Sequence, residues 1–185
     1  ASISGVLHIG RLSDTIRCDA VVTSLKDSGV VTDFIWTADN ADPLRKIPEG
    51  VPKEYKQYIG MSLPTIPDPE GCHKSYEEHF RSDYLEVIDN FIQNKMKAFS
   101  MFEEYRKGTF KKNIKIILDN YEKVFEIVNS HRPKDQPLTK EWSPWQPICK
   151  NCNKIITPRV TKIEKGKVHY VCKDYQFKTQ IAVGC

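Results

Sequence analysis

Near the start of the chain, the pattern of hydrophobic and polar positions predicts one helix followed by one strand. From Thr15 to Gly29 apolar residues recur at helical spacing and the stretch closes on a glycine, which predicts an amphipathic helix with a glycine stop. Residues 30–39 are rich in β-branched and aromatic side chains, which predicts a buried strand. A polar loop with a proline follows. The order turn, helix, strand, polar loop is that of half of a doubly wound α/β unit.

Further along, two longer apolar stripes at helical spacing follow a loop-rich stretch, residues 44–72. They predict helices from about Tyr76 to Phe102 and from Thr109 to Asn129, whose apolar faces we expect in the core. These faces consist of Phe80, Tyr84, Val87, Phe91 and Phe99, and of Ile114, Ile117, Leu118, Tyr121, Phe125 and Val128. No convincing parallel strand follows the first one. Because a doubly wound unit also needs a strand before its first turn, we expect a sheet truncated at both ends.

The last forty residues carry a spacing of cysteines that is typical of zinc sites. Cys149 and Cys152 form a C-x-x-C pair, and Cys172 ends a stretch that alternates around residues 164–167 as a β-hairpin would. Tyr175 stands where a fourth cysteine is expected, so Cys185 or His169 must complete a tetrahedral site. Zinc held by thiolates on such a module would be structural. The alternative is a ribbon without metal.

Three further candidate ligands lie close together near the start of the first long helical stripe. They are Cys72, His73 and His79, which either form a second metal site or line a pocket. Two histidines at this separation do not share one helical face well. The spacing therefore favours ordinary residues at the start of a helix.

Composition and charge indicate a folded protein with a basic second half. Apolar residues make up 39% and charged residues 28% of the chain, which is normal for a soluble folded protein, and the net charge is +4. Residues 149–178 carry eight Lys/Arg against two Asp/Glu. That imbalance suits a phosphate-backbone partner, although solvated lysine faces are equally common. No apolar run approaches the ~20 residues of a membrane span and no leader is evident. We therefore expect a cytoplasmic protein without a membrane partner, whose oligomeric state stays open.

A candidate phosphate-binding turn, His8-Ile9-Gly10, comes directly before the first predicted helix. The N-terminus of a helix favours phosphate through its dipole and its N–H groups. A histidine there can donate to phosphate oxygens, and a glycine lets a nucleotide approach the backbone. Ligands of doubly wound sheets bind outside the carboxyl ends of the strands, where this turn and the polar loop at residues 39–42 would both lie.

Four ordered blocks carry a resemblance to a known family. "SGVLHIG", "FIWTADNADPLRKIP", "IPDPEGCHKSYEEHF" and "WSPWQPICKNC" resemble, in that order, the class I lysyl-tRNA synthetases of archaea and some bacteria. The resemblance implies an α/β fold: the first half of a Rossmann-type catalytic domain at residues 1–70, without its first strand. A helical insertion at 71–147 and a zinc-ribbon-like module at 148–185 would follow.

The same resemblance implies a reaction and roles for individual residues. The family activates lysine with ATP and Mg²⁺ to lysyl-adenylate and transfers it to tRNA(Lys). Gly5, His8, Ile9 and Gly10 would bind ATP, with His8 and Gly10 catalytic; Ser2, Asp39 and Asp42 would form the lysine pocket, the acids facing an ammonium group. Cys149, Cys152, Cys172 and Cys185 are the expected ligands of structural Zn²⁺.

Two expectations complete this interpretation. The family's KMSKS loop is absent from these residues, so we expect the chain by itself to activate lysine poorly or not at all. The alternative function is a non-catalytic zinc-ribbon and helical module that binds RNA and retains a vestigial nucleotide site.

Overall fold

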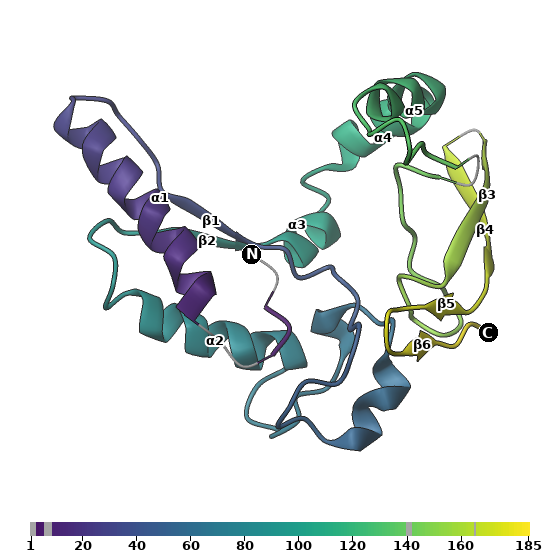
Figure 1. The fold of residues 1–185 in the computed structure, drawn as a ribbon, viewed down its shortest axis with the longest axis horizontal. Coiled ribbons are helices and arrows are strands. Elements are labelled where there is room, and N and C mark those ends of the chain that lie inside the picture. The colour runs from purple at the N-terminus through teal and green to yellow at the C-terminus, as the bar shows by residue number, and fades with distance from the viewer. Residues whose placement is uncertain (1–2, 6–8, 140–141, 165) are drawn as a thin grey trace.

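The fold combines helices with three small two-stranded sheets, as a computed structural model describes it for residues 3–5, 9–139, 142–164 and 166–185 (Figure 1). Ser2 and His8 lie outside these residues. The elements in the first part are α1 (Ile9–Asp27), β1 (Ile35–Ala38), the 3₁₀ helices η1 (Lys53–Tyr58) and η2 (Leu63–Thr65), α2 (Tyr76–Ile88) and β2 (Lys97–Ser100). The second part contains α3 (Met101–Lys107), α4 (Lys111–Asp119), α5 (Tyr121–Ser130), β3 (Pro158–Glu164), β4 (Lys167–Cys172), β5 (Tyr175–Gln176) and β6 (Ile181–Ala182). Helices and strands thus alternate in the first part, which makes the chain α/β.

A parallel strand that the sequence did not reveal pairs with β1. β2 lies parallel to β1, with Ile35 opposite Lys97, and α2 belongs to the connection between the two strands. The single helix predicted from Tyr76 to Phe102 is therefore wrong. The backbone N–H groups of Gln93 and Asn94 donate to the carboxylate of Asp19 on α1, both at 3.0 Å, so these groups do not serve a continuing helix. In consequence the side chains of Phe91 and Phe99 are 54% and 40% exposed instead of lying in the core.

The second predicted helix is divided in two. α4 ends at Asp119 and α5 begins at Tyr121, because Asn120 between them leaves helical conformation, with φ −118° and ψ 30°. Its backbone N–H and its side-chain amide both donate to the carbonyl of Ile116, at 3.2 and 2.8 Å. No residue of either helix is buried, so the expected core position of this stripe is wrong as well. Figure 1 shows α4 and α5 standing away from β1 and β2, next to the β3–β4 hairpin.

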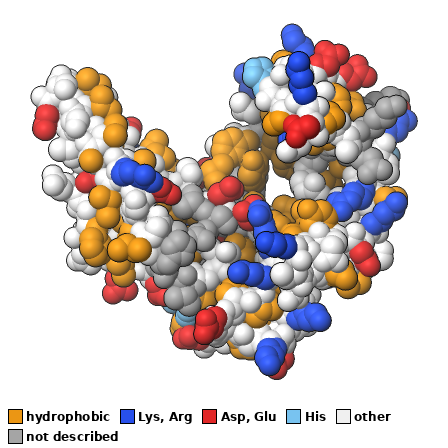
Figure 2. All heavy atoms as spheres, viewed as in Figure 1, with side chains coloured by type: hydrophobic (Ala, Val, Ile, Leu, Met, Phe, Trp, Pro, Cys, Tyr) orange, Lys and Arg blue, Asp and Glu red, His pale blue; other side chains and the backbone are white. Residues whose placement is uncertain are grey.

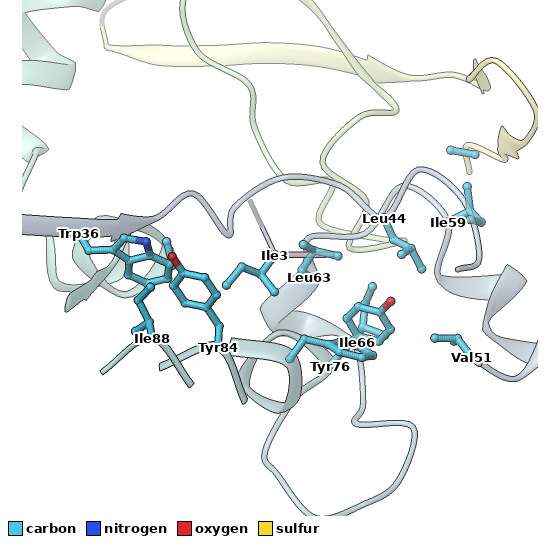
Figure 3. Packing of buried hydrophobic residues seen from close by; sticks show 13 residues of the cluster. Ile3, Trp36, Leu44, Val51, Ile59, Leu63, Ile66, Tyr76, Tyr84 and Ile88 are labelled. Carbon is cyan, nitrogen blue, oxygen red and sulfur yellow. The ribbon is translucent and has the colours of Figure 1, made fainter. Parts of the chain in front are cut away.

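The main hydrophobic core lies between α2, β1 and the loop that connects them (Figure 3). The rings of Trp36 on β1 and Tyr84 on α2 stack with centroids 5.3 Å apart. Ile3 is buried in the same cluster, and the hydroxyl of Tyr76 donates to the carbonyl of Ser4 at 2.9 Å. These contacts fix the chain immediately before the candidate phosphate-binding turn.

The first helix begins, and the two strands end, where ligands are expected. α1 begins near the centre of the molecule and runs outward, whereas β1 and β2 both run back toward the centre (Figure 1). Thr15 near the start of α1 lies against α2, with its hydroxyl 2.5 Å from that of Tyr84. The N-terminus of α1 and the carboxyl ends of both strands consequently face the same side of the molecule.

The predicted hairpin around residues 164–167 is confirmed. β3 and β4 pair antiparallel, with Glu164 opposite Lys167. The module that contains this hairpin docks on the core through Gly60, whose carbonyl accepts from the N–H of Ile155 at 2.9 Å. A Cβ at Gly60, which has φ +90°, would lie 2.7 Å from the Cβ of Ala182, so this close approach requires glycine. Among the described residues, no helix is long and apolar enough to cross a membrane.

Candidate functional site

The described part of the candidate phosphate-binding turn comprises Gly5, Ile9 and Gly10. α1 begins at Ile9, so the positive end of the helix dipole comes directly after His8 in the chain. Ile9 is 82% exposed and therefore is not held in the core. A Cβ at Gly5 would lie 3.1 Å from Cγ of Pro48, so the backbone here passes close to its neighbour.

The two acidic residues expected in the lysine pocket lie directly after β1. Asp39 is exposed, and the half-buried carboxylate of Asp42 accepts from Arg45 at 3.5 Å. The carbonyl of Asp42 accepts from the N–H of Leu63 at 3.2 Å, which ties the loop to the core. Both residues thus follow the carboxyl end of β1, and that end of the strand lies on the side of the molecule at which α1 begins (Figure 1).

A buried polar network holds this acidic loop, and no pattern in the sequence indicated it. Asn40 is buried; its amide donates to the hydroxyl of Ser100 at 2.9 Å and its carbonyl accepts from the N–H of Phe102 at 2.9 Å. Glu77, buried as well, accepts from Arg81 at 2.8 Å, and burial raises the pKa of its carboxyl group. The network connects the loop to α2 and to the start of α3, so Asp39 and Asp42 flank a rigid anchor.

Four cysteines converge in the C-terminal module. The Sγ atoms of Cys149, Cys152, Cys172 and Cys185 all lie within 4.8 Å of one another. Cys149 and Cys185 are 3.5 Å apart, and Cys152 and Cys172 are 3.7 Å apart. Zn–S bonds of about 2.3 Å in a tetrahedron place sulfur atoms about 3.8 Å apart. The donor set therefore fits a closed, four-coordinate zinc site.

The pKa shifts of Cys149, Cys152 and Cys185 also fit a bound cation. Burial alone raises the pKa of Cys149, but hydrogen bonds from the backbone N–H groups of Cys152 and Asn151 outweigh it and lower this pKa to about 6. The neighbouring thiols of Cys149 and Cys172 raise the pKa of Cys185 to about 12. The thiolate of Cys149 thus forms readily, whereas the raised pKa values of Cys152 and Cys185 disfavour further negative charge, which a divalent cation would offset.

The fourth position of the cysteine cluster is taken by Cys185 rather than by His169. His169 lies on β4 opposite Lys162, is exposed, and is not among the converging groups. Tyr175, which stands where a fourth cysteine was expected, has the guanidinium of Arg159 over its ring at 5.0 Å and so serves packing.

A second cluster of metal-binding groups lies at the start of α2. Asp68, Cys72, His73 and His79 each offer a ligand atom, and these atoms lie within 4.8 Å of one another. The Sγ of Cys72 is 3.1 Å from Nδ1 of His73 and 3.2 Å from Nδ1 of His79. Nδ1 of His79 is in turn 3.2 Å from the buried carboxylate of Asp68. One carboxylate and one thiolate would neutralise a divalent cation, and two imidazoles would complete a tetrahedron.

Groups outside this second cluster orient its histidines. The far nitrogen of His73, Nε2, is 2.9 Å from the hydroxyl of Ser82, and that of His79 is 4.0 Å from the carboxylate of Glu70. Metal-bound imidazoles usually have a hydrogen-bond partner on their second nitrogen, as His73 does here, whereas 4.0 Å at His79 is beyond hydrogen-bond distance. Burial raises the pKa of Asp68, but the N–H groups of Glu70 and His73 outweigh this and lower it to about 2. The carboxylate is therefore ionised.

The sequence favoured His73 and His79 as ordinary residues at the start of a helix, on the assumption that both lie in the same helix. In the structure they do not. α2 begins at Tyr76 with Ser75 as its N-cap, so His73 precedes the helix and only His79 belongs to it. The helical-face argument therefore does not apply. The sequence did not indicate Asp68 as a ligand, because it lies in the proline-rich loop. The only sign of a metal site nearby is the pair Cys72-His73, which begins four residues later.

Comparison with known proteins yields one family and several relatives. The family described as tRNA synthetases class I (K) matches residues 1–184. The chain is 41% identical over 180 residues to a lysine–tRNA ligase of Methanocaldococcus jannaschii, covering 96% of the chain and 33% of that protein. It is 34% identical to the ligase of Archaeoglobus fulgidus, covering 92% and 34%, and 32% identical to that of Pyrococcus horikoshii, covering 79% and 28%. The chain thus spans about a third of the length of these relatives.

Proposed function

The chain belongs to the class I tRNA synthetases (K), and from this membership we propose that it supplies one part of a lysine–tRNA ligase. The whole enzyme would use ATP to activate lysine as lysyl-adenylate and would then esterify tRNA(Lys). In this proposal residues 1–70 are half of a Rossmann-type catalytic domain, residues 71–147 a helical insertion and residues 148–185 a zinc-ribbon-like module. The enzyme would act in the cytoplasm, where its thiols stay reduced.

The observation that carries the proposal is the match over residues 1–184, together with the position of the acidic loop. Asp39 and Asp42 follow β1 on the side where α1 begins, which is where an amino acid has to meet ATP. Their carboxylates offer a countercharge to an ammonium group. Ser2 would add a hydroxyl to the same pocket. Asn40, which lies between the two acids in the chain, would hold their loop in place through its hydrogen bonds to Ser100 and Phe102.

The proposed steps at the turn follow from helix electrostatics and hydrogen bonding. The phosphates of ATP, which enters as its Mg²⁺ complex, would lie at the N-terminus of α1. His8 would donate a hydrogen bond to phosphate oxygens as negative charge develops on the departing pyrophosphate. Gly5, Ile9 and Gly10 would present backbone to the nucleotide at close range. Positioning and electrostatic stabilisation, rather than covalent catalysis, would thus be the contribution of this part of the enzyme.

We also propose that the two ligand clusters hold structural zinc. Cys149, Cys152, Cys172 and Cys185 would bind one ion, and Asp68, Cys72, His73 and His79 another. Zinc supplies a cross-link between segments that are distant in sequence and takes no part in the reaction. The second ion would attach the proline-rich loop to the start of α2.

The test is lysylation of tRNA(Lys) by the protein extended to the full length of its relatives. We expect tRNA to be charged with radioactive lysine, and Asp42→Asn to raise the KM for lysine about tenfold or more, which corresponds to the loss of one charge-assisted hydrogen bond. Asp135→Asn, an exposed acid beyond α5, is the matched control and should leave the KM unchanged. A folded, zinc-loaded protein that binds tRNA but charges none of it would instead support the RNA-binding module.

A further inference from the structure

The cysteine cluster lies next to the contacts that dock the C-terminal module on the core. Lys154 comes two residues after Cys152 and pairs with Met61 in an isolated antiparallel bridge. Ile155, the next residue, donates its N–H to the carbonyl of Gly60 at 2.9 Å. Only two or three residues of backbone therefore separate a sulfur atom of the cluster from the docking contacts.

The far end of the module connects the cluster to the core in the same way. Ala182 is completely buried in the main core, where it lies against Gly60, and it comes three residues before Cys185. The N–H of Cys185 in turn donates to Sγ of Cys172 at 3.3 Å. A displacement of the sulfur atoms would consequently be passed on to a buried residue at the docking contact.

The docked module forms one wall of a groove of about 800 Å³ beside the acidic loop. Ile155, Tyr175 and Phe177 line the groove from the module, and Asp39 and Asp42 line it from the loop. Figure 2 shows a hollow between the two halves of the molecule, with hydrophobic side chains inside it. Because the module supplies one wall, the groove depends on docking.

Two pairs of sulfur atoms in the cluster are close enough for disulfide bonds to form between them. Cys149 and Cys185 are 3.5 Å apart, and Cys152 and Cys172 are 3.7 Å apart. A disulfide bond is about 2.05 Å long, so each pair would have to close by about 1.5 Å. Cys185 is exposed whereas Cys149 is buried, so a small oxidant meets Cys185 first.

The second cluster, Asp68, Cys72, His73 and His79, differs in this respect. Cys72 supplies the only sulfur among these four residues. If Cys72 were oxidised to a sulfenic acid, there would be no thiol within the cluster with which it could condense. The two proposed zinc sites should therefore respond differently to an oxidant that joins two thiols.

We propose that the cysteine cluster is a reversible redox switch: a hydroperoxide joins Cys149 and Cys185 in a disulfide, zinc is released, and the C-terminal module undocks from the core. The inference rests on the proposed function, which places zinc in this cluster. Closing the pair by about 1.5 Å shifts the backbone on both sides of the docking contact. The close approach at Gly60 is then lost, and with it one wall of the groove.

The chemistry needs one hydroperoxide for each disulfide. The thiolate of Cys185 attacks one peroxide oxygen, the O–O bond breaks, and the other oxygen leaves as hydroxide or alkoxide, so that Cys185 becomes a sulfenic acid. The thiolate of Cys149 then attacks that sulfur, the S–S bond forms, and the S–O bond breaks with loss of hydroxide. The two thiolates lose two electrons and the peroxide gains them. Two thiolates remain, too few for a closed zinc site.

Reduction restores the docked state. The thiolate of an added dithiol attacks the disulfide and then closes to its own disulfide, which returns Cys149 and Cys185 to thiols that can bind zinc again. In a reducing compartment the zinc-bound, docked form is therefore the resting state.

The direct test treats the reduced, zinc-loaded protein, extended to the length of its relatives, with an equimolar amount of hydrogen peroxide. We expect a chromogenic chelator to detect the release of zinc, and peptide mapping by mass spectrometry to find Cys149 joined to Cys185. Dithiothreitol followed by added zinc should reverse both changes. Release of zinc without this disulfide, or a disulfide between Cys149 and Cys152 in its place, would overturn the proposal.

Two variants assign the released zinc to one cluster when the oxidant is diamide, whose net reaction joins two thiols. His79→Ala disrupts the second cluster, so its remaining zinc lies in the cysteine cluster and should be released. Cys172→Ser disrupts the cysteine cluster, and the zinc of its second cluster should stay bound. Cys18→Ser replaces an exposed cysteine outside both clusters and should respond as the wild type does. Release from Cys172→Ser equal to that from His79→Ala would contradict the assignment.

Hydrogen exchange measures the undocking itself. After oxidation, the N–H of Ile155, which donates to Gly60, should exchange about tenfold faster or more, because its partner is no longer held beside it. The N–H of Tyr76, which donates to Ile66 within the core at 2.9 Å, should exchange as before. Unchanged protection of Ile155 in a protein that has released its zinc would overturn the switch.

The lysylation assay separates this proposal from the proposed function. We expect charging of tRNA(Lys) to fall on oxidation and to recover on reduction. If the reduced protein charges tRNA and charging does not change when zinc is released, the switch fails alone. If neither form charges tRNA but oxidation still releases zinc and deprotects Ile155, the proposed activity fails and the switch stands. A reduced protein with no zinc in the cysteine cluster would overturn the switch whatever its activity.

Discussion

The Sγ atoms of Cys149 and Cys185 lie 3.5 Å apart, although 36 residues separate the two cysteines along the chain. Cys152 and Cys172 form a similar pair at 3.7 Å. Each pair brings the C-x-x-C segment next to a segment that comes later in the chain. The four sulfurs therefore lie together at one end of the module, and the β3–β4 hairpin extends from that end. A module with so few buried residues would depend on the proposed zinc ion as a cross-link between these segments.

The first prediction concerns the metal content of this cysteine cluster. We expect the purified chain to contain two zinc ions by mass spectrometry, and Cys172→Ser to contain one. Structural zinc contributes about 10–16 kcal/mol of apparent binding free energy, so the variant module should also become sensitive to protease between residues 148 and 185. Cys18→Ser, an exposed cysteine of α1 outside both clusters, should retain both ions. Two zinc ions in Cys172→Ser would contradict the assignment.

The second prediction concerns the cluster at the start of α2. His79→Ala should remove one zinc ion and leave the other, and the double variant with Cys172→Ser should contain none, because the two clusters share no ligand. His169→Ala replaces an exposed histidine of β4 and should not change the metal content. If His79→Ala retains two ions, the second site does not exist as described.

Gly60 provides a test of how the C-terminal module docks on the core. Gly60→Ala brings a Cβ to within 2.7 Å of Ala182 in addition to forcing a residue with a side chain into positive φ. Gly50→Ala has the same conformational cost at φ +84° but meets no atom within 4 Å. We expect Gly50→Ala to lower the free energy of unfolding by about 1 kcal/mol. Gly60→Ala should lower it by about 1–3 kcal/mol more, as judged by urea titration. Equal losses of unfolding free energy in the two variants would show that the close approach of Gly60 to Ala182 does not contribute to stability.

Asp19 should make stability depend on pH below about 4. Burial raises the pKa of Asp19, but hydrogen bonds from Gln93 and Asn94 outweigh it and lower the pKa in the folded state. The stabilisation is therefore complete above the unfolded value of about 3.9 and is lost as the pH falls through the lower folded value. At pH 6 we expect Asp19→Asn to cost about 1–3 kcal/mol in urea unfolding, and the difference should shrink toward pH 2.5. Asp14→Asn, an exposed acid on the same helix, should differ little from wild type at either pH. A constant difference for Asp19→Asn would refute the mechanism.

Local signals in the sequence were sufficient for the hairpin and for the C-x-x-C knuckle. They also indicated the helix α1, but not its bounds or its buried face: α1 begins at Ile9 rather than at Thr15, and Ile16, Val21 and Leu25 are exposed. A glycine stop, an alternating pattern and a fixed cysteine spacing each act within a few residues, so they can be read without the tertiary structure. β2 could not be predicted in this way. It has four residues, and the segment before it is held out of helical conformation by Asp19, which lies 74 positions earlier than Gln93.

The sites show the same division between local and long-range information. The positions of Asp39 and Asp42 after β1 follow from the strand and the loop that the sequence indicates. Asn40 looks like another polar loop residue until its partners on α3 and β2 are known. The second cluster of candidate metal ligands depends on Asp68, which comes from a loop and lies beside His79 only through the packing of that loop against the start of α2.

The most direct test of the proposed function is ATP–pyrophosphate exchange by the protein extended to the length of its relatives, with tRNA(Lys) present. We expect exchange that requires lysine and falls about 100-fold or more in His8→Ala, the usual loss when one donor to a developing negative charge is removed. His131→Ala, an exposed histidine after α5, should exchange normally. Wild-type exchange in His8→Ala, or no lysine-dependent exchange from a folded, zinc-loaded protein, would contradict the proposal.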